Sequence, residues 1–516
     1  MHNQDSIIEL LDKLTDNIEI LLRITRGKLD EVVAIFCNTL DTDHYSFSTK
    51  TKALSLLYYT AFREDMTLQE CWEIYWIITS RLFVDSKEKI IDFSNMFKAH
   101  NNNIPIEWKE IPSRSILYRY IFNTVFAEID YSRMTFRTKE ERNAELIVII
   151  TDQFLGLQHA PTVRVLDYAY TIQEKIGKKV IIINSAGTHY LRKEEWNFNS
   201  AFSFIEDYNN VNRIEYKNTI FEFVQVSCFM PDINVLQFMT EMIYKINPLF
   251  VYNIGASCLL ADLCTPFVTT ASLPCSLYYP VTCSEYLLVG RSVSKSEDDY
   301  NNILDYQKVL ETNYNFIYKN SSLVYKKEDF QIPFNSFVIT TVGYRLEEEI
   351  DDSFINVIDK ILDYERFNVK PELGFAPLYM VIVGVYNNKE KLLDRINPSN
   401  RKRIIFTGLI QDASEFTRLC NLYINPERMG GGRSSFDCLH FGIPVVTLKY
   451  GDVYYICGKE FGVENWDEYY DIVRKYCYDV DWYDKQREVA LQRASKLEDI
   501  ESTLRDLINN LMKMRE

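Results

Sequence analysis

The sequence contains few of the residue patterns that mark metal-binding or disulfide-linked proteins. Its 516 residues include 11 cysteines and six histidines, but no two cysteines form a Cys-x-x-Cys pair, and no histidine flanks them at the spacing of metal ligands. The cysteines are odd in number and scattered through apolar segments, which is typical of buried free thiols in a reducing compartment. We therefore expect no metal site and no disulfide framework.

Excess positive charge and long apolar runs are also missing. With 57 Lys and Arg against 73 Asp and Glu, the net charge is −16, and a protein of this sign is repelled by nucleic acid and by anionic membrane surfaces. No apolar run approaches the length of a membrane span, and Met1–Glu9 lack the pattern of a signal peptide. We expect a cytoplasmic protein with no nucleic-acid partner and with absent or peripheral membrane association. A small anionic ligand is compatible with this charge, because a loop of N–H groups with one arginine overrides the global field locally.

The sequence does contain ample material for packed cores. Hydrophobic residues make up 47% and aromatic residues 14% of the chain, and its length predicts about three domains. Residues 1–140 carry apolar side chains at helical spacing and predict a helical accessory domain, which would bind an acceptor or partner and offers a surface for oligomer formation. Residues 145–320 and 336–516 alternate strands with helices, and polar Asn320–Asn335 is the expected linker.

Two β-rich runs, Leu146–Ile150 and Phe337–Thr341, begin these α/β regions. Their β-branched content is typical of parallel strands that are buried on both faces. Further runs of this kind alternate with amphipathic helices, which predicts a doubly wound sheet in each region. We therefore predict two tandem Rossmann-like domains that face a cleft, preceded by an all-α domain.

The most informative stretch is Asn425–Leu448, which has the order strand, glycine loop, helix, strand. A loop without Cβ atoms lets N–H groups approach an oxyanion closely, and the positive end of the following helix points there. The loop and the helix start add a cation, two hydroxyls and a carboxylate suited to ribose hydroxyls. The residues concerned are Gly430, Gly431, Gly432, Arg433, Ser434, Ser435 and Asp437. We interpret the stretch as a cradle for the diphosphate and ribose of a nucleotide; the alternative is a turn that serves strand-to-helix packing alone.

Other strand ends carry residues that would lie near such a site. Ligands of an open parallel sheet lie beyond the carboxyl ends of its strands. These ends carry Gly343–Arg345 and Gly408 in the second α/β region, and the loops Thr151–His159 and Gly255–Ser257 in the first. His159 is the candidate general base, since a neutral imidazole in a strand-to-helix loop can take the proton of a substrate hydroxyl. The alternative is a histidine that caps or packs against the helix start.

The turn Val342–Arg345, together with the glycine loop ahead of Phe441–Val446, resembles the GT-B glycosyltransferases. The resemblance runs from Glu145 to the C-terminus, and the helical region before it is similar to that of the protein O-GlcNAc transferases and the related bacterial adhesin glycosyltransferases. It implies a nucleotide-sugar donor, with uridine the common base in these families, and no other cofactor. The roles that it implies are pyrophosphate binding by Gly432, Arg433 and Ser434, ribose binding by Asp437, and neutralisation of the leaving diphosphate by Arg345.

The loop departs from the pattern of the large retaining family of GT-B enzymes, which places two glutamates around it. The matching positions are Met429 and Asp437, and Glu427 would compensate only if the loop were shifted in register. We therefore favour inversion, a single displacement for which His159 would be the base.

No metal is required in this scheme, because Arg345 and the loop N–H groups supply the positive charge. The Asp-x-Asp sequences at 41–43 and 479–481 are away from the inferred site.

Three functions fit these observations. The first is a hexosyl- or N-acetylhexosaminyltransferase that moves a sugar from a UDP-sugar to a protein or peptide. The second is a retaining or inverting transferase of capsule or cell-wall glycan synthesis on a lipid carrier, which the acidic balance disfavours. The third is an inactive GT-B scaffold or chaperone, which Met429 supports and which the intact glycine loop and Arg345 oppose.

Overall fold

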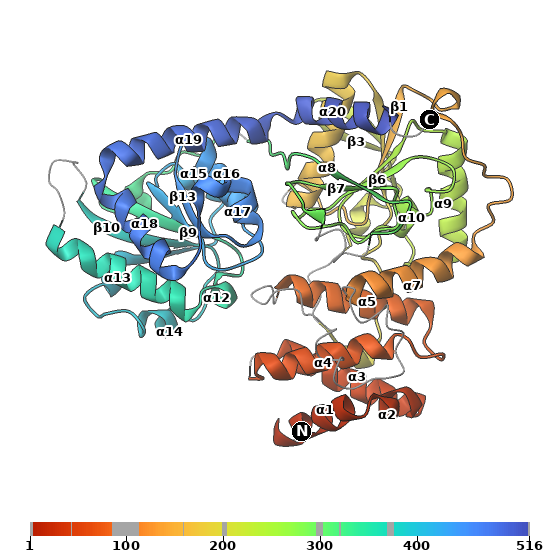
Figure 1. Ribbon diagram of the computed structural model, residues 1–516, viewed down its shortest axis with the longest axis horizontal. Coiled ribbons are helices and arrows are strands. Elements are labelled where there is room, and N and C mark those ends of the chain that lie inside the picture. The colour runs from red at the N-terminus through yellow and green to blue at the C-terminus, as the bar shows by residue number, and fades with distance from the viewer. Residues whose placement is uncertain are drawn as a thin grey trace. The chain divides into compact units, whose positions relative to one another are not determined.

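A computed structural model of the chain describes residues 4–42, 44–84, 113–157, 159–198, 204–295, 303–318, 321–368 and 376–513. The chain divides into two compact units, of which the first comprises Met1–Thr312 with Glu501–Glu516 and the second Asn313–Ile500. Each unit holds a sheet of mainly parallel strands with flanking helices, and further helices precede the first sheet (Figure 1). The predicted fold class, two Rossmann-like domains after an all-α region, is confirmed.

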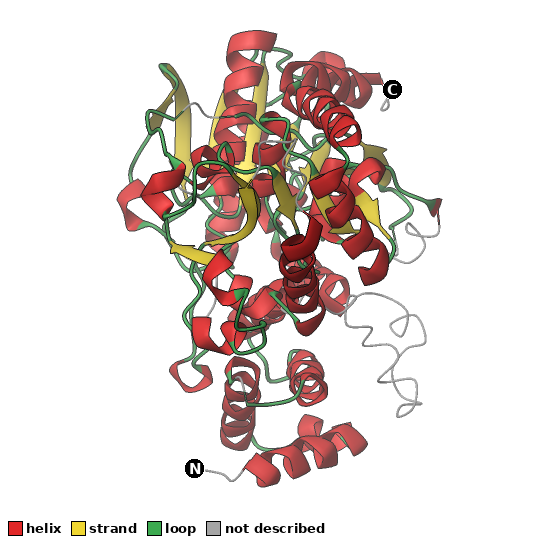
Figure 2. Cartoon of the chain, turned by 90° about the vertical axis from the view of Figure 1, so that its left-hand side faces the viewer, coloured by secondary structure: helices red, strands yellow, loops and turns green. Residues whose placement is uncertain are grey.

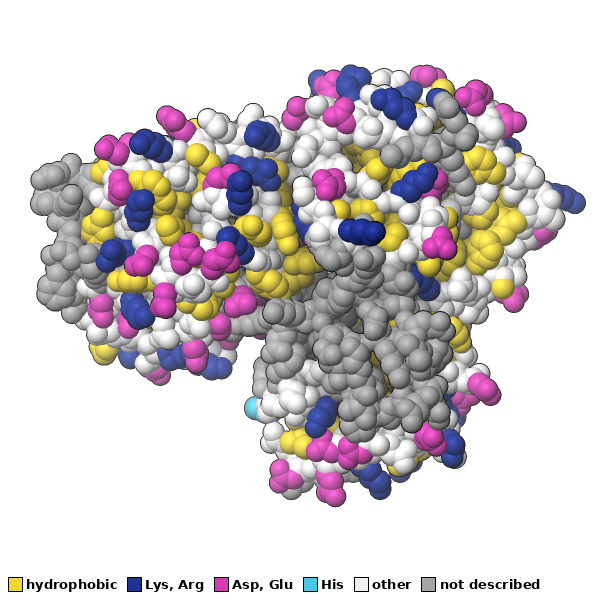
Figure 3. Space-filling view, in the orientation of Figure 1, with side chains coloured by type: hydrophobic (Ala, Val, Ile, Leu, Met, Phe, Trp, Pro, Cys, Tyr) yellow, Lys and Arg dark blue, Asp and Glu magenta, His cyan; other side chains and the backbone are white. Residues whose placement is uncertain are grey.

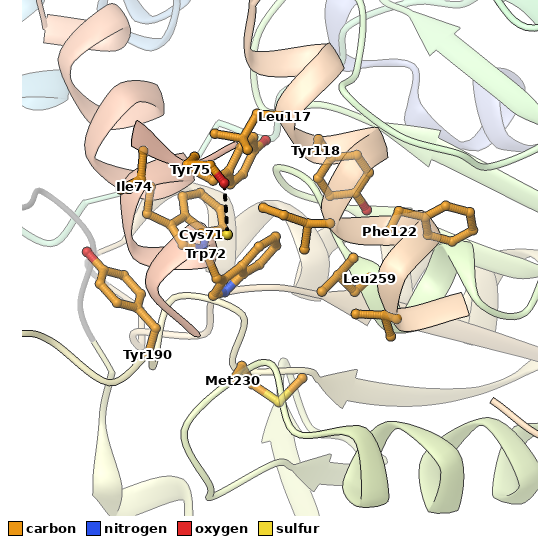
Figure 4. Packing of buried hydrophobic residues seen from close by; sticks show 14 of the residues in the cluster. Cys71, Trp72, Ile74, Tyr75, Leu117, Tyr118, Phe122, Tyr190, Met230 and Leu259 are labelled. Atoms are coloured by element: carbon orange, nitrogen blue, oxygen red, sulfur yellow. Dashed lines mark hydrogen bonds between the residues drawn. The ribbon is translucent and has the colours of Figure 1, made fainter. Parts of the chain in front are cut away.

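The described residues of the N-terminal part, up to Glu128, form helices and no strand (Figure 2). Its described helices are α1 (Gln4–Asp16), α2 (Ile18–Arg23), α3 (Arg26–Asp41), α4 (Phe47–Thr60), α5 (Leu68–Val84) and α7 (Ser113–Glu128). One cluster of buried apolar side chains extends from Ile7 in α1 to Cys283 beside the first sheet. Within it, Trp72 and Tyr75 of α5 stack on each other and lie against Tyr118 of α7 (Figure 4). The helices are therefore packed into the core of the first unit.

The first sheet has the order β3-β4-β2-β1-β5-β6-β7-β8. Its strands are β1 (Leu146–Thr151), β2 (Lys179–Asn184), β3 (Arg213–Tyr216), β4 (Thr219–Gln225), β5 (Val251–Ile254), β6 (Thr270–Leu273), β7 (Tyr286–Val289) and β8 (Lys308–Glu311). All neighbours pair in parallel except β3 and β4, which form a hairpin with its turn at Lys217 and Asn218. Strand β1 is central, fully buried and β-branched, as a parallel strand covered on both faces must be.

The second sheet has the order β11-β10-β9-β12-β13-β14, and every pair is parallel. Its strands are β9 (Ser336–Val342), β10 (Ala376–Val383), β11 (Ile404–Gly408), β12 (Leu422–Ile424), β13 (Val445–Leu448) and β14 (Gly462–Val463). Counted from its first strand, this is the order 3-2-1-4-5-6 of the doubly wound fold. The parallel strands of the first sheet begin in the same way, so both sheets reverse direction beside their first strand.

The remaining helices flank the sheets. In the first unit they are α8 (Ala160–Tyr170), which continues as a π-helical turn (Thr171–Ile176), α9 (Ile233–Ile246), α10 (Leu259–Asp262) and, closing the chain, α20 (Ile500–Lys513). In the second unit they are α12 (Leu346–Glu349), α13 (Asp352–Asn368), α14 (Lys389–Leu393), α15 (Ala413–Thr417), α16 (Gly432–His440), α17 (Gly451–Cys457), α18 (Trp466–Tyr478) and α19 (Val480–Glu498).

Some elements have no counterpart in the sequence pattern. Strand β8 is half-exposed, β14 has two residues, and α17 is short and begins at a glycine, so none of them carries a readable apolar period. The expected linker, described from residue 321 to 335, lies within the second unit, which begins at Asn313. The boundaries of the three predicted domains stay a prediction.

Acidic and basic side chains are interspersed on the face shown in Figure 3. Within the described residues, no helix combines the length and the apolar character needed to cross a membrane.

Candidate functional site

The second sheet reverses direction between β9 and β12. These two strands are paired, with Thr340 opposite Tyr423, and β10 and β13 continue the sheet on either side. Connections leave two such strands in opposite directions and open a crevice between them, which is where doubly wound folds bind ligands. The chain leaves β9 through Gly343–Arg345 and β12 through Asn425–Gly431. The two predicted donor-binding segments therefore adjoin at this switch point.

The glycine loop ends at the N-terminus of α16. Gly431 has a φ of +100°, and the nine-residue helix begins at Gly432. The N–H groups of Gly432, Arg433 and Ser434 lie in the first turn, where the helix offers no carbonyl to accept them. These donors and the helix dipole favour an anion at this position. Ser434 is half-buried, whereas Ser435 is buried and donates its hydroxyl to the Gly432 carbonyl at 2.9 Å.

Arg428 is a buried arginine that the sequence analysis did not identify. Its Nε donates to Asn425 Oδ1 and its Nη1 to Glu349 Oε2, both at 2.8 Å. Its Nη2 donates to the Val342 carbonyl at 2.8 Å and to the Tyr423 hydroxyl at 2.7 Å. These bonds fasten the ends of β9 and β12 to each other and to α12. Arg428 therefore supports the loop from inside the fold, with its charge compensated by Glu349.

Three glycines leave the space that Arg428 occupies. A Cβ on Gly343 would lie 2.4 Å from Nη1, and a Cβ on Gly431 would lie 2.6 Å from Nη2. A Cβ on Gly451, which follows β13, would lie 2.1 Å from the Arg428 carbonyl oxygen. These glycines thus accommodate the protein's own arginine as well as leaving the loop open to a ligand. The position of Arg428 between Pro426 and the glycines is a signal in the sequence, but nothing there shows that the side chain points inward.

Arg345 brings a second guanidinium to the loop. Its Nη2 donates to Glu349 Oε1 at 3.1 Å and would lie 3.4 Å from a Cβ on Gly430. Glu349 therefore divides its carboxylate between Arg345 and Arg428, and this trio keeps one net positive charge. The side chain of Arg345 is 31% exposed, so that the charge is accessible to a ligand at the loop.

Arg433 and Asp437 form an ion pair along one turn of α16. Arg433 Nε donates to Asp437 Oδ1 at 3.1 Å, and the guanidinium is 34% exposed. Asp437 is buried, and burial raises the pKa of its carboxyl to about 6 in spite of the adjacent Arg433. One carboxylate oxygen is therefore occupied by Arg433. The proposed ribose contact of Asp437 stays a prediction, while its contact with Arg433 is in the structure.

Gly408 and Glu427 lie at the margin of the site. Gly408 ends β11 with a φ of +69° and accepts the Gly384 N–H at 3.1 Å. Gly384 in turn packs so closely that a Cβ there would lie 1.8 Å from the Gly343 carbonyl oxygen. The sequence analysis missed Gly384, although it directly follows a predicted strand. Glu427 is half-buried. The pKa of Tyr450 is raised to about 12, mainly by burial of Tyr450 and secondly by the negative charge of Glu427.

The first sheet has its own switch point, between β1 and β5. Asp152 follows β1 directly, is 2% exposed, and accepts the Ala256 N–H of the loop after β5 at 2.8 Å through Oδ1. Gly255 has a φ of +152°, and a Cβ there would lie 2.3 Å from Asp152 Oδ1. The loop after β5 is therefore shaped around this carboxylate, which the sequence analysis did not select.

His159 is the residue immediately before α8. Its Nδ1 lies 2.9 Å from Thr162 Oγ1, and the same hydroxyl oxygen accepts the Leu155 N–H at 2.8 Å. Burial lowers the pKa of His159 to about 4, so the imidazole is neutral at neutral pH. The geometry places His159 in the strand-to-helix loop as expected, and its role as base stays a prediction.

Helix α5 braces the loops at this switch point. Trp72 Nε1 donates to the Gly187 carbonyl, in the loop after β2, at 2.8 Å. The Tyr75 hydroxyl and the Ser257 hydroxyl, in the loop after β5, are 2.5 Å apart. Figure 4 shows Trp72 and Tyr75 next to each other among the buried apolar residues. The N-terminal helices are therefore structural supports of the first unit's candidate site.

The described residues of the two Asp-x-Asp sequences belong to helices α3 and α19 or their ends. Asp41 ends α3, Asp43 lies outside the described residues, and Asp479 caps α19 by accepting the Trp482 N–H. In the part of the chain that the structure describes, no group of three or more His, Cys, Asp and Glu side chains is arranged to hold a metal ion.

Comparison with known proteins gives similarity in structure alone. No protein-family model matches the chain, and no curated protein matches it. A glycosyltransferase from Rickettsia africae ESF-5 is 12% identical with a TM-score of 0.50, and the match covers 72% of this chain and 100% of that one. A mutant O-GlcNAc transferase from Thermobaculum terrenum is 11% identical with a TM-score of 0.51, over 100% of this chain and 98% of that one. The chain has the GT-B fold, which confirms the fold that the resemblance implied.

Proposed function

We propose that the protein is a glycosyltransferase that uses a nucleoside-diphosphate sugar, with a UDP-sugar as the expected donor. The observation that carries this proposal is the anion site at the switch point of the second sheet. There the free N–H groups at the start of α16 lie beside two half-exposed guanidiniums, those of Arg345 and Arg433. The fold is also that of solved glycosyltransferases.

This geometry suits a diphosphate leaving group. The N–H groups of Gly432, Arg433 and Ser434 would bind phosphate oxygens, and Arg345 would neutralise the charge that develops as the sugar–phosphate bond breaks. Preorganised cations and amides stabilise such charge without reorganisation, so we propose that the reaction needs no metal.

We further propose a protein or peptide acceptor and an inverting displacement. The N-terminal helices share a core with the acceptor-side sheet and brace its switch-point loops, so they are placed to present a macromolecule to it. The structural match to an O-GlcNAc transferase covers the full length of this chain, so it includes the helical region. Inversion rests on Met429, which stands where retaining relatives carry a glutamate.

The first test is calorimetric titration of the full chain with UDP. We expect binding by the parent protein and a loss of at least about tenfold in affinity in Arg433→Ala and in Asp437→Ala, because both change the guanidinium at the start of α16. Arg401→Ala is the matched control, since Arg401 precedes β11 at the opposite, amino edge of the same sheet and should leave binding unchanged. A folded parent protein that binds none of UDP, GDP and ADP would reject the transferase and favour the scaffold.

A further inference from the structure

Asp152 occupies the position in the first unit at which three loops converge. It follows β1, its Oδ1 accepts the Ala256 N–H from the loop after β5, and its Cβ would lie 3.4 Å from a Cβ on Gly187, in the loop after β2. Polar residues at this edge of a doubly wound sheet face the ligand crevice. The carboxylate is thus held where an acceptor substrate would bind, and Gly255 provides the room for it.

Asp262, another buried carboxylate of this unit, accepts hydrogen bonds at both of its oxygens, whereas Asp152 accepts one at Oδ1. Asp262 accepts from the Tyr118 and Ser284 hydroxyls at 2.5 and 2.7 Å, from the Cys283 N–H at 2.7 Å, and from the Thr282 hydroxyl. Asp152 Oδ1 takes the single bond from Ala256, and no other described residue donates to Oδ2. An acceptor oxygen that no described protein group uses is available to a hydroxyl of a bound substrate.

Neighbouring groups leave Asp152 free to act as a base near neutral pH. Burial raises the pKa of its carboxyl to about 6, so it is mostly ionised at pH 7 and still binds a proton readily. The titratable groups that face it are Tyr75 of α5 and Cys258 before α10, and burial raises the pKa of each to about 12. Both are therefore uncharged and do not compete for the proton.

The hydrogen bonding of His159 favours a different role for the imidazole. Thr162 Oγ1 already accepts the Leu155 N–H, so its own proton is available to His159 Nδ1. A neutral imidazole that accepts at Nδ1 carries its proton on Nε2 and presents a donor there.

We infer that Asp152 is the proton acceptor of the transfer reaction and that His159 acts in the same reaction as a hydrogen-bond donor through Nε2. This inference rests on the proposed function. In the step, the oxygen of the acceptor hydroxyl forms a bond to the anomeric carbon. The bond from that carbon to the diphosphate oxygen breaks and its electron pair leaves with the diphosphate. The hydroxyl proton passes to Asp152 Oδ2.

The test compares three variants of the full chain in UDP release from UDP-glucose and UDP-N-acetylglucosamine, with a mixture of Ser- and Thr-containing peptides as acceptors. Asp152→Asn keeps an oxygen for the Ala256 N–H but cannot take a proton, so kcat should fall at least about 100-fold. The KM for the donor and the affinity for UDP should stay within about twofold, because the second unit sets them. His159→Gln, which retains an N–H donor, should keep kcat within about tenfold.

Asp167→Asn is the control for removal of a buried carboxylate, since Asp167 bonds to Tyr216 and Lys217 away from the switch point, and it should retain the parent's kcat. The parent's kcat/KM should fall as pH drops below about 6, and this acid limb should persist in His159→Gln.

The outcomes distinguish failure of this inference from failure of the proposed function. An Asp152→Asn variant with more than half of the parent's kcat, or loss of the acid limb in His159→Gln, would overturn the inference and leave the proposed function standing. Binding of UDP without turnover of either donor would overturn it in favour of the scaffold. Failure of the parent to bind UDP at all would reject the proposed function, and the inference with it.

Discussion

The two sheets reverse direction at the same place but put opposite charges there. In the first unit the residue after the central strand is Asp152, a carboxylate held by one backbone amide. In the second, the space after β9 is left open by Gly343 and filled by the guanidinium of Arg428. The shared topology fixes where a ligand can lie. The residue that lies at that point determines the function of the site: a carboxylate can accept a proton, and a cation can bind an anion.

Both sites rely on glycine to make room, yet their polar groups differ in completeness. A side chain on Gly255 would displace the Asp152 carboxylate, and one on Gly431 would displace Arg428. Arg428 makes four hydrogen bonds and is therefore structural, whereas Asp152 retains an unused oxygen among the described residues. The partly exposed cations of the second site are the guanidiniums of Arg345 and Arg433, which lie near Arg428.

The largest effect should come from removing the buried guanidinium. Arg428→Met leaves the buried Glu349 carboxylate with Arg345 alone and removes the donor of the Val342 carbonyl, which should lower the free energy of unfolding by about 3–5 kcal/mol. Urea unfolding followed by circular dichroism measures this, and calorimetry should show loss of UDP binding. Arg23→Met is the control: Arg23 pairs with Glu19 at the surface with 78% of its side chain exposed, and its loss should cost below about 1 kcal/mol. Equal urea midpoints for both variants would show that Arg428 does not hold the site together.

The pH dependence of stability should distinguish Asp152 from an ordinary carboxyl. Burial raises its pKa to about 6 in the folded chain, from the ordinary value of 3.8. The folded state therefore holds this proton more tightly, and the contribution is fully present below about pH 4 and lost as pH rises to about 6. Asp152→Asn removes the titration, so its stability relative to the parent should rise by about 2 kcal/mol between pH 4 and 6. Urea midpoints across this range test it, and a difference independent of pH would contradict the raised pKa.

Alanine at the glycines should separate the two sites. Gly431→Ala forces a side chain into a left-handed residue and against Arg428, so we expect a loss of about 1–3 kcal/mol and weaker UDP binding. Gly255→Ala should lower turnover and leave UDP binding unchanged, because it displaces Asp152 in the other unit. Gly177→Ala is the matched control, since Gly177 has a φ of +81° but nothing within 4 Å of an added Cβ. Equal UDP affinity in Gly177→Ala and Gly431→Ala would argue against crowding of Arg428.

The smallest effect should come from the brace between α5 and the first site. Tyr75→Phe removes the hydroxyl that bonds to Ser257 and keeps the ring in its stack with Trp72. We expect a loss of about 0.5–1.5 kcal/mol in the free energy of unfolding, with a modest decrease in turnover and no change in UDP affinity. A turnover equal to that of the parent would show that the loop after β5 holds its position without this bond.

Much of the fold could be predicted from local sequence. Leu146–Ile150 and Lys179–Asn184 are β-branched and apolar because they form strands buried on both faces, and both became central strands. The order strand, glycine loop, helix, strand in Asn425–Leu448 was also confirmed, with α16 beginning at Gly432. These features are encoded within a few consecutive residues.

What the sequence could not supply depends on contacts between distant segments. The position of Arg428 beside the glycine loop is typical of a phosphate-binding arginine. Its side chain is buried instead, because it donates hydrogen bonds to Glu349 and Val342, far earlier in the chain. Asp152 belonged to the predicted loop, but its significance follows from its bond to Ala256 in the loop after β5, which only tertiary structure reveals. Strands β8 and β14 were not predicted, because they are defined by pairing with a neighbouring strand and not by their composition.

The division of the chain also constrains how the protein is made. Helix α20 belongs mainly to the first unit, where Leu504, Leu507 and Leu511 are buried, but a ribosome completes it only after the whole of Asn313–Ile500. Domains generally fold during synthesis from the N-terminus onward. The first unit therefore stays incomplete, with the surface that packs against α20 exposed, while the second unit is synthesised and folds. During that interval the nascent chain exposes apolar surface that a chaperone can recognise, and a ribosome stalled before α20 would release a second unit that is complete and a first that is not.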